Sequence, residues 1–357
     1  MWLTCLAIAT AALLGGPARA ASVPLEPLPP RPGWLVASPP NVSAPSWILF
    51  DASTDWLIAG REYESRRPLA STTKMMTALV AADRSDFDEM VTISATAAEA
   101  GEAEIGVVAG EVLRMGDLVS AILIRSANDA AEAIAEHIGG SIEGFAELMN
   151  QKAAGMGLAN THFVNPHGLD APDHYSSARD LMQIAREVLA NPQLAAMVRS
   201  TSIDFPPAPD GTRRGGASTN SLLDGYEGAI GVKTGFTFQA SLVLAAAAER
   251  DGRLLMAVVM GSEGVGGHFA DAAALLDYGF AEAAIHQTPG TSPAATRLDR
   301  VARVEALTWL AASGLLTEAG ESDPAAEVVS RGSEDPPGWR EALSWAPRYW
   351  GWLSGDG

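Results

Sequence analysis

Short apolar runs of strand length stand at both ends of residues 46–280, and this arrangement limits the folds open to the chain more than any other feature. The runs at 47–51 and 56–61 are separated by four turn-forming residues, and those at 240–248 and 254–261 by a charged turn that contains glycine. Each pair has the pattern of a β-hairpin, in which a turn rich in small and polar residues joins two strands. We therefore expect one antiparallel hairpin near each end of the folded region.

Between the hairpins, apolar residues recur every three or four positions, which is the spacing of an amphipathic helix. The expected helices are 115–124, 127–138, 142–154 and 178–189, with a closing helix at 270–280. A further helix is expected to begin at Ser71. Strands at both ends with helices between them predict an α+β domain, in which N- and C-terminal strands share one antiparallel sheet flanked by helices, with a helical middle region.

Composition divides the chain into four segments. Residues 1–20 hold an apolar run followed by an Ala-x-Ala sequence, the pattern of a secretory signal peptide with its cleavage site. Residues 21–45 are expected to form a proline-rich leader, 46–282 the folded domain and 283–357 a low-complexity tail. The only cysteine, Cys5, lies inside the expected signal peptide, so the secreted protein would contain no disulfide.

The charged residues exclude one class of partner and direct attention to a few side chains. With 24 Lys and Arg against 43 Asp and Glu, the formal charge is −19, which argues against nucleic acid as a partner because phosphate backbones bind positive surfaces. Only three of the basic residues are lysines: Lys74, Lys152 and Lys233. A buried lysine can lose its proton whereas an arginine stays charged, so lysines in an arginine-rich chain are candidates for proton transfer.

Two of these lysines lie in a series of three short motifs: Ser71-Thr72-Thr73-Lys74, Ser126-Ala127-Asn128 and Lys233-Thr234-Gly235. Ser-x-x-Lys at the start of a helix places a hydroxyl one turn from an amine. Ser71 is the predicted nucleophile, and Lys74 is the predicted base because burial and the charge of Lys233 would lower its pKa. Ser126 can relay a proton to the leaving nitrogen, and Asn128 can hold Lys74 and a substrate amide by hydrogen bonds.

The third motif predicts how a substrate is held. Thr234 and the backbone of the Lys-Thr-Gly strand can bind an extended peptide and its carboxylate. The backbone N–H groups of Ser71 and Phe236 are the predicted oxyanion hole. The six histidines of the chain lack the spacing of a metal site, so neither a metal nor a cofactor is expected.

The motifs and their surroundings resemble the serine-type D-alanyl-D-alanine carboxypeptidases, the low-molecular-weight penicillin-binding proteins of the peptidase S11 family. The resemblance covers about residues 46–280, and the same three motifs, with Ser-Asp-Asn in the middle, are typical of penicillin-binding proteins. The segments that carry the resemblance are 68–78, 126–131, 165–170, 176–180 and 231–237.

The resemblance implies a DD-peptidase/β-lactamase-like fold in residues 46–282 and an enzyme of the periplasm or cell surface. Such enzymes remove the terminal D-alanine from peptidoglycan stem pentapeptides through an acyl-enzyme, which would form on Ser71. The same resemblance implies that Lys74 is the base, Ser126 the third catalytic residue and Lys233 a substrate-binding residue. Peptidoglycan stem peptides would then be the partners, and β-lactam antibiotics the covalent inhibitors.

Two positions depart from the family pattern. Family members usually carry an arginine that helps to bind the substrate carboxylate, and the matching stretch, 261–269, has His268 instead. After Lys-Thr-Gly the family tends to read Ala-Gly, where this chain has Ala240-Ser241. The predicted substrate-binding residues are Asn128, Lys233, Thr234, Gly235, Phe236 and His268.

Three other functions remain open at this point. A D,D-endopeptidase that cuts peptidoglycan cross-links would use the same motifs. A β-lactamase would need a separate carboxylate to drive water onto the acyl-enzyme, and Glu147 superficially resembles such a group. A non-catalytic cell-wall-binding protein could keep the fold, although all three motifs are chemically intact.

The tail is notable for four tryptophans, Trp339, Trp345, Trp350 and Trp352. Helical spacing puts several apolar residues of this segment on one face, which would suit a peripheral membrane contact. Pro347 and the shortage of basic residues argue instead for a disordered or self-docking tail. Both alternatives stay open.

Overall fold

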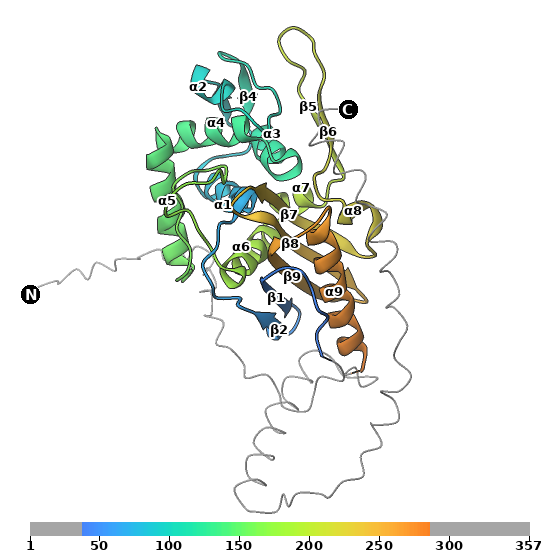
Figure 1. Cartoon of the computed structure of the whole chain (residues 1–357). Helices are drawn as coiled ribbons and strands as arrows, with labels where there is room; N and C mark the ends of the chain where they lie inside the picture. Colours follow the sequence, from blue (N-terminus) through green and yellow to red (C-terminus); the bar gives the residue numbers. More distant parts are fainter. Residues whose placement is uncertain (1–37, 286–357) are drawn as a thin grey trace, which may run out of the picture.

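The computed structural model describes residues 38–285, and a five-stranded antiparallel sheet lies at its centre. The strand order is β2-β1-β9-β8-β7 (Figure 1). The strands are β1 (Ser46–Asp51), β2 (Trp56–Arg61), β7 (Ala229–Thr237), β8 (Ser241–Arg250) and β9 (Arg253–Ser262). Because β1 pairs directly with β9, the predicted sharing of one sheet by N- and C-terminal strands is confirmed, and so is the α+β class.

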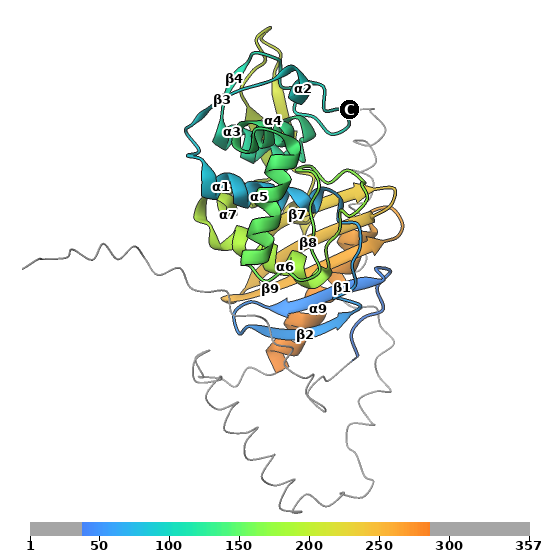
Figure 2. The ribbon, with the colours of Figure 1, turned by 90° about the vertical axis from the view of Figure 1, so that its left-hand side faces the viewer.

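Both faces of the sheet are buried, which explains why β8 and β9 read as nearly continuous apolar runs. Helix α9 (Gly267–Ile285) covers one face, and α1 (Lys74–Arg84) and α6 (Ala178–Ala190) lie on the other (Figure 2). Alternate residues of β8 belong to separate apolar clusters on the two faces. The sheet therefore forms the middle layer of three.

The helical region follows the predicted order closely. Its remaining long helices are α4 (Asn128–Gly139) and α5 (Ile142–Gly155), with the shorter α7 (Pro192–Val198) after α6. Ser141, Ser177 and Asn191 accept backbone N–H hydrogen bonds with their side chains at the starts of α5, α6 and α7. These caps satisfy N–H groups that the first turn of a helix leaves without a partner, so local sequence fixes where the three helices begin.

Two predicted helices differ from expectation at the places where the motifs lie. A 3-10 helix, Ala70–Thr73, precedes α1, so Ser71 stands in a tighter turn than an α-helix would give. The helix expected at 115–124 is α3 (Met115–Ser120) followed by a π-helical turn, Ala121–Arg125. Turns of this kind occur often at functional sites.

Several elements of three or four residues complete the described region, and they are too short to show a clear periodicity in the sequence. They are α2 (Ala95–Ala98), α8 (Leu222–Gly225) and two two-stranded sheets, β3 (Met90–Thr92) with β4 (Val112–Arg114) and β5 (Ser202–Phe205) with β6 (Arg214–Ala217). The β5–β6 hairpin projects beyond the helical region (Figure 1).

The packed part of the chain begins before β1. The Asp271 carboxylate on α9 accepts hydrogen bonds from the backbone and hydroxyl of Ser43 and from the backbone of Ala44. Val42 and Ala44 are themselves buried. The end of the proline-rich segment predicted over 21–45 is therefore fixed against the sheet's covering helix.

No helix within residues 38–285 is long and apolar enough to cross a membrane. The predicted signal peptide (1–20) and the tryptophan-rich segment of the tail lie outside the described residues.

Candidate active site

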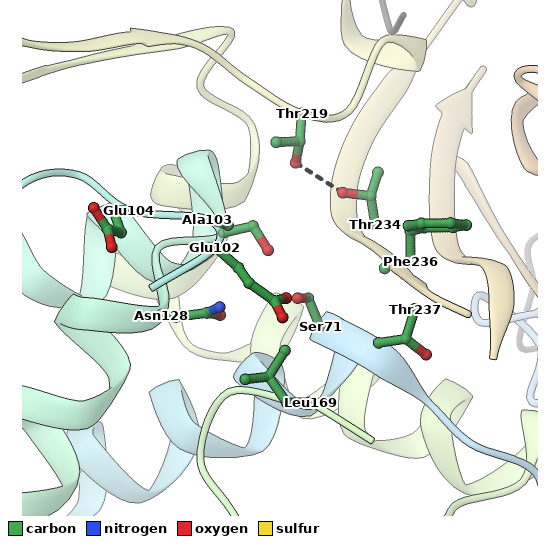
Figure 3. A pocket seen from close by; sticks show the side chains of 12 residues that line it. Ser71, Glu102, Ala103, Glu104, Asn128, Leu169, Thr219, Thr234, Phe236 and Thr237 are labelled. Atoms are coloured by element: carbon green, nitrogen blue, oxygen red, sulfur yellow. Dashed lines mark hydrogen bonds between the residues drawn. The ribbon is translucent and has the colours of Figure 1, made fainter. Parts of the chain in front are cut away.

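A cavity of about 550 Å³ opens beside the edge strand β7. That volume is typical of a small-molecule or peptide site. Its lining residues are Ser71, Glu102, Ala103, Glu104, Ser126, Asn128, Leu169, Thr219, Thr234, Gly235, Phe236 and Thr237 (Figure 3). All three sequence motifs thus meet at one cavity, although more than 150 residues separate the first from the third.

The side chain of Lys74 lies directly beneath Ser71. Its Nζ atom is 3.0 Å from Ser71 Oγ and donates hydrogen bonds to Asn128 Oδ1 at 2.7 Å and to the His167 carbonyl at 2.6 Å. The side chain is fully buried. Three contacts, two of them from distant parts of the chain, therefore fix one amine.

Burial lowers the pKa of Lys74 well below its ordinary value, and the charge of Lys233 lowers it further. The charges of Asp129 and Glu102 act in the opposite direction. The desolvation effect is the largest because a buried ammonium loses its hydration. This environment favours the neutral amine, which is the form able to accept a proton.

Ser126 lies where the π-helical turn ends and the chain reverses. Its φ of +63° is in the left-handed region, a strained conformation for a residue other than glycine and one that is concentrated at functional sites. The buried Lys233 donates from Nζ to Ser126 Oγ at 3.0 Å and to the Thr234 carbonyl at 2.9 Å. Burial lowers the pKa of Lys233 to about 7. Each buried amine therefore contacts one hydroxyl of the cavity.

Strand β7 packs closely against the 3-10 turn that carries Ser71. A Cβ atom at Gly235 would lie only 3.0 Å from Ser71 N and 3.0 Å from the Ala70 side chain, so glycine permits this approach. Phe236 is partly exposed at the rim, and Thr234 Oγ1 lies 2.7 Å from Thr219 Oγ1. Because β7 is an edge strand, its free side can pair with an extended peptide.

The segment from His167 to His174 packs against the 3-10 turn that carries Ser71. Thr73 Oγ1 lies 2.9 Å from His174 Nε2, and His174 Nδ1 accepts from the Val164 backbone, which places the ring proton on Nε2. Gly168, at φ +94°, lies so close that an added Cβ would stand 2.0 Å from the Ala70 carbonyl oxygen. The family-like motif in this segment therefore has a packing role, and the His167 carbonyl also holds Lys74.

His268 is not part of the cavity. It is the second residue of α9, has no exposed surface, and its ring centroid lies 3.9 Å from that of Phe269. Burial lowers its pKa to about 3, so the imidazole is neutral. His268 is buried and does not line the cavity, so the structure gives no support to the prediction that it binds a substrate carboxylate.

Six residues that line the cavity were not predicted as site residues: Glu102, Ala103, Glu104, Leu169, Thr219 and Thr237. Thr237 follows the third motif on the same strand, whereas only tertiary structure brings the other five to the three motifs. Glu147, the carboxylate considered for a β-lactamase, is exposed on α5 and is not among the lining residues.

Within residues 38–285, no three His, Cys, Asp or Glu side chains come close enough together to hold a metal ion. The cavity presents a hydroxyl next to a buried amine, a second hydroxyl next to a second amine, and an open strand edge. These features define the class as a serine hydrolase that employs lysine rather than histidine beside its serine.

Comparison with known proteins specifies the family. The profile of the peptidase S11 family, described as D-alanyl-D-alanine carboxypeptidase, matches residues 35–264, and the chain belongs to that family. D-alanyl-D-alanine carboxypeptidase DacB2 of Mycobacterium tuberculosis is 37% identical over 247 residues, which cover 68% of this chain and 84% of the relative. DacF of Bacillus subtilis and DacD of Escherichia coli are each 34% identical; in both cases the match covers 68% of this chain and 64% of the relative, slightly under two thirds.

Solved structures agree with this assignment. The crystal structure of a D-alanyl-D-alanine carboxypeptidase from M. tuberculosis H37Rv matches with a TM-score of 0.66 and 34% identity, covering 72% of this chain and 96% of that one. The Streptomyces K15 DD-transpeptidase matches with a TM-score of 0.65 and 29% identity, covering 69% of this chain and 100% of that one. The DD-peptidase fold predicted from the sequence is confirmed.

Proposed function

We propose that the protein is a D-alanyl-D-alanine carboxypeptidase that removes the terminal D-alanine from peptidoglycan stem pentapeptides through an acyl-enzyme on Ser71. The family match and the names of the relatives support this activity. The observation that carries the mechanism is the position of the Lys74 amine, which lies between Ser71 Oγ and two carbonyl oxygens.

The geometry suits a neutral Lys74 acting as the base. A neutral amine has two hydrogens and one lone pair, and the Asn128 and His167 carbonyl oxygens can accept both hydrogens. The lone pair is then directed at the Ser71 hydroxyl, 3.0 Å away. Lys74 takes the hydroxyl proton as Oγ attacks the carbonyl carbon of the scissile bond, and the backbone N–H groups of Ser71 and Phe236 would bind the oxyanion.

The second half of acylation needs a proton on the leaving nitrogen. We assign this transfer to Ser126, which lines the same cavity as Ser71 and is held by Lys233. The proton taken by Lys74 is passed on through Ser126, the carbon–nitrogen bond breaks, and D-alanine leaves as its amine. Lys233 and Thr234 are proposed to bind the terminal carboxylate, while the open edge of β7 pairs with the peptide backbone. A β-lactam would acylate the same serine.

The experiment is incubation of the purified protein with a pentapeptide muropeptide and, separately, with a cross-linked dimer, followed by mass analysis. We expect loss of one D-alanine from the pentapeptide. The Ser71→Ala variant should release none, while keeping the wild-type melting temperature. Cleavage of the dimer in preference to the pentapeptide would contradict the proposal and favour an endopeptidase.

The site of action is proposed from the sequence. The Ala-x-Ala sequence before residue 21 supports export across the inner membrane into the periplasm, and the tryptophan-rich segment supports a peripheral membrane contact there. Mass analysis of the exported protein should give an N-terminus near residue 21. Sedimentation with lipid vesicles should fall when the chain is cut after residue 285, and equal sedimentation of both forms would rule out the contact.

A further inference from the structure

The loop that carries Glu102 has an unusual backbone. Gly101 and Glu102 follow one another with φ values of +67° and +64°. Glycine adopts this conformation readily, but a glutamate there is strained, and such residues persist only where the surrounding structure holds them. The conformation turns the Glu102 side chain toward the cavity that contains Ser71.

The second motif holds this loop in place. Asn128 donates from Nδ2 to the Gly101 carbonyl at 3.2 Å and from its backbone N–H to the Ala103 carbonyl at 2.5 Å, so it binds the residue on each side of Glu102. The neighbouring Asp129 carboxylate accepts backbone hydrogen bonds from three successive residues, Ile105, Gly106 and Val107. Asn128 is also the acceptor for Lys74. One residue thus connects the proposed base to the Glu102 loop.

The Glu102 carboxylate points toward the Ser71 hydroxyl, whereas that of Glu104 lies on the far side of the cavity (Figure 3). The charge of Glu102 raises the pKa of Lys74, whose amine is in contact with Ser71. Within the part of the chain that the structure describes, no hydrogen bond to the Glu102 carboxylate is present, and the residue is exposed. Its oxygens are therefore open to water in the cavity.

Hydrolysis of the acyl-enzyme requires a water molecule that Lys74 is poorly placed to activate. The amine has no exposed surface and faces Ser71 Oγ, the atom that carries the acyl group in the intermediate. Water reaches the ester carbon from the cavity, the side on which Glu102 lies. A carboxylate in that position can accept a proton from the attacking water.

We propose that Glu102 is a further catalytic residue, the general base that drives water onto the acyl-enzyme of Ser71. Glu102 takes one proton from water as the water oxygen bonds to the ester carbonyl carbon. The tetrahedral intermediate collapses with cleavage of the bond from carbon to Ser71 Oγ, and Glu102 returns the proton to that oxygen. The shortened peptide leaves with a free carboxyl group, and Glu102 is again a carboxylate. The inference rests on the proposed carboxypeptidase function.

The test compares full-length wild type with Glu102→Gln, which keeps the size and backbone of the side chain but cannot act as a base. Acylation is followed with a fluorescent penicillin, and deacylation with a depsipeptide ending in D-alanyl-D-lactate, whose easy acylation makes hydrolysis of the acyl-enzyme limiting. We expect acylation within about threefold of wild type and deacylation slower by about 10²-fold. Glu99→Gln is the matched control, since Glu99 is exposed on the same segment and does not line the cavity.

Chemical rescue separates a lost base from a disturbed loop. Hydroxylamine is a neutral nucleophile that attacks an ester without deprotonation, so it should release the acyl group from Glu102→Gln as fast as from wild type. Deacylation of Glu102→Gln within about threefold of wild type would overturn the proposal, and so would an acyl-enzyme that resists hydroxylamine. If wild type itself were neither acylated nor able to release D-alanine, the proposed function would fail instead, which is a different observation.

Discussion

Both faces of the central sheet are buried, yet only one of them carries the chemistry. Toward α9 the strands present an almost purely apolar surface, including Leu244, Leu255 and Val259. On the opposite side the buried residues include Lys74, Asn128 and Lys233. Burying a lysine destabilises the folded state because the charged form loses its hydration. The comparison shows that the buried lysines are confined to the side where the cavity lies, while packing against α9 stabilises the sheet.

The sharpest way to break this comparison is to keep a buried basic side chain at position 74 and remove its ability to give up a proton. Lys74→Arg does this because a guanidinium has no neutral form at working pH. We expect the rate of acylation by a penicillin to fall by about 10³-fold, because the proposed base is lost. Lys152→Arg is the control: Lys152 lies on α5 and pairs with Asp83 at 2.6 Å, away from the cavity. Retained acylation in Lys74→Arg would mean that Lys74 is not the base.

A smaller effect is expected from adding one methyl group on either face. Gly235→Ala pushes a Cβ against the backbone of Ser71, whereas Gly279→Ala meets the end of the Leu255 side chain at 2.8 Å, which can move. Both variants should lose about 1–2 kcal/mol of unfolding free energy by overpacking. Only Gly235→Ala should also lose acylation, by about tenfold or more, since only it displaces the nucleophile. Urea unfolding and penicillin labelling of both variants give the two measurements, and equal loss of labelling in both would refute the distinction.

The smallest effect is a pH dependence that separates the two buried lysines. The pKa of Lys233 is about 7, so its positive charge is lost as the pH rises above that value. If the charge binds the substrate carboxylate, KM should rise by up to about tenfold between about pH 6 and about pH 9. The pKa of Lys74 is also lowered, so this amine loses its proton at a lower pH than a solvated lysine, and kcat should rise with pH as it does so. Lys233→Arg should abolish the increase in KM with pH and leave the rise in kcat. If KM still increased with pH in this variant, the pH dependence of KM would belong to another group.

Much of the fold followed from local sequence because the strands of its central sheet are long and apolar. The hairpins at 47–61 and 240–261 and most of the long helices were predicted within a few residues. The π-helical turn before Ser126 was not, since Ala121–Arg125 has the same apolar spacing as the helix it follows. The β5–β6 hairpin was also missed, because the Arg-Gly-Gly-Ala sequence of β6 has no apolar alternation.

The candidate site was predicted only where the residue types of a short motif indicate a chemical role. Ser71, Lys74, Ser126 and Lys233 stand in short motifs, and the structure brings all four together around one cavity. Glu102 reaches the cavity through a strained turn held by a residue 26 positions later, which no local pattern reveals. His268 illustrates the converse: its place in the stretch 261–269 says nothing about burial, which depends on how α9 packs.

The pairing of β1 with β9 has a consequence for how the enzyme matures. Register partners such as Ser46 and Met260 are more than 200 residues apart, so the sheet cannot close until nearly the whole described region is available. Contacts between distant residues slow folding, because a long loop must be closed before they form. We therefore expect the cavity to be a late product of folding, and a chain ending before β9 to bind no penicillin. Peptidase activity would then arise only once nearly all of residues 38–285 is available to fold.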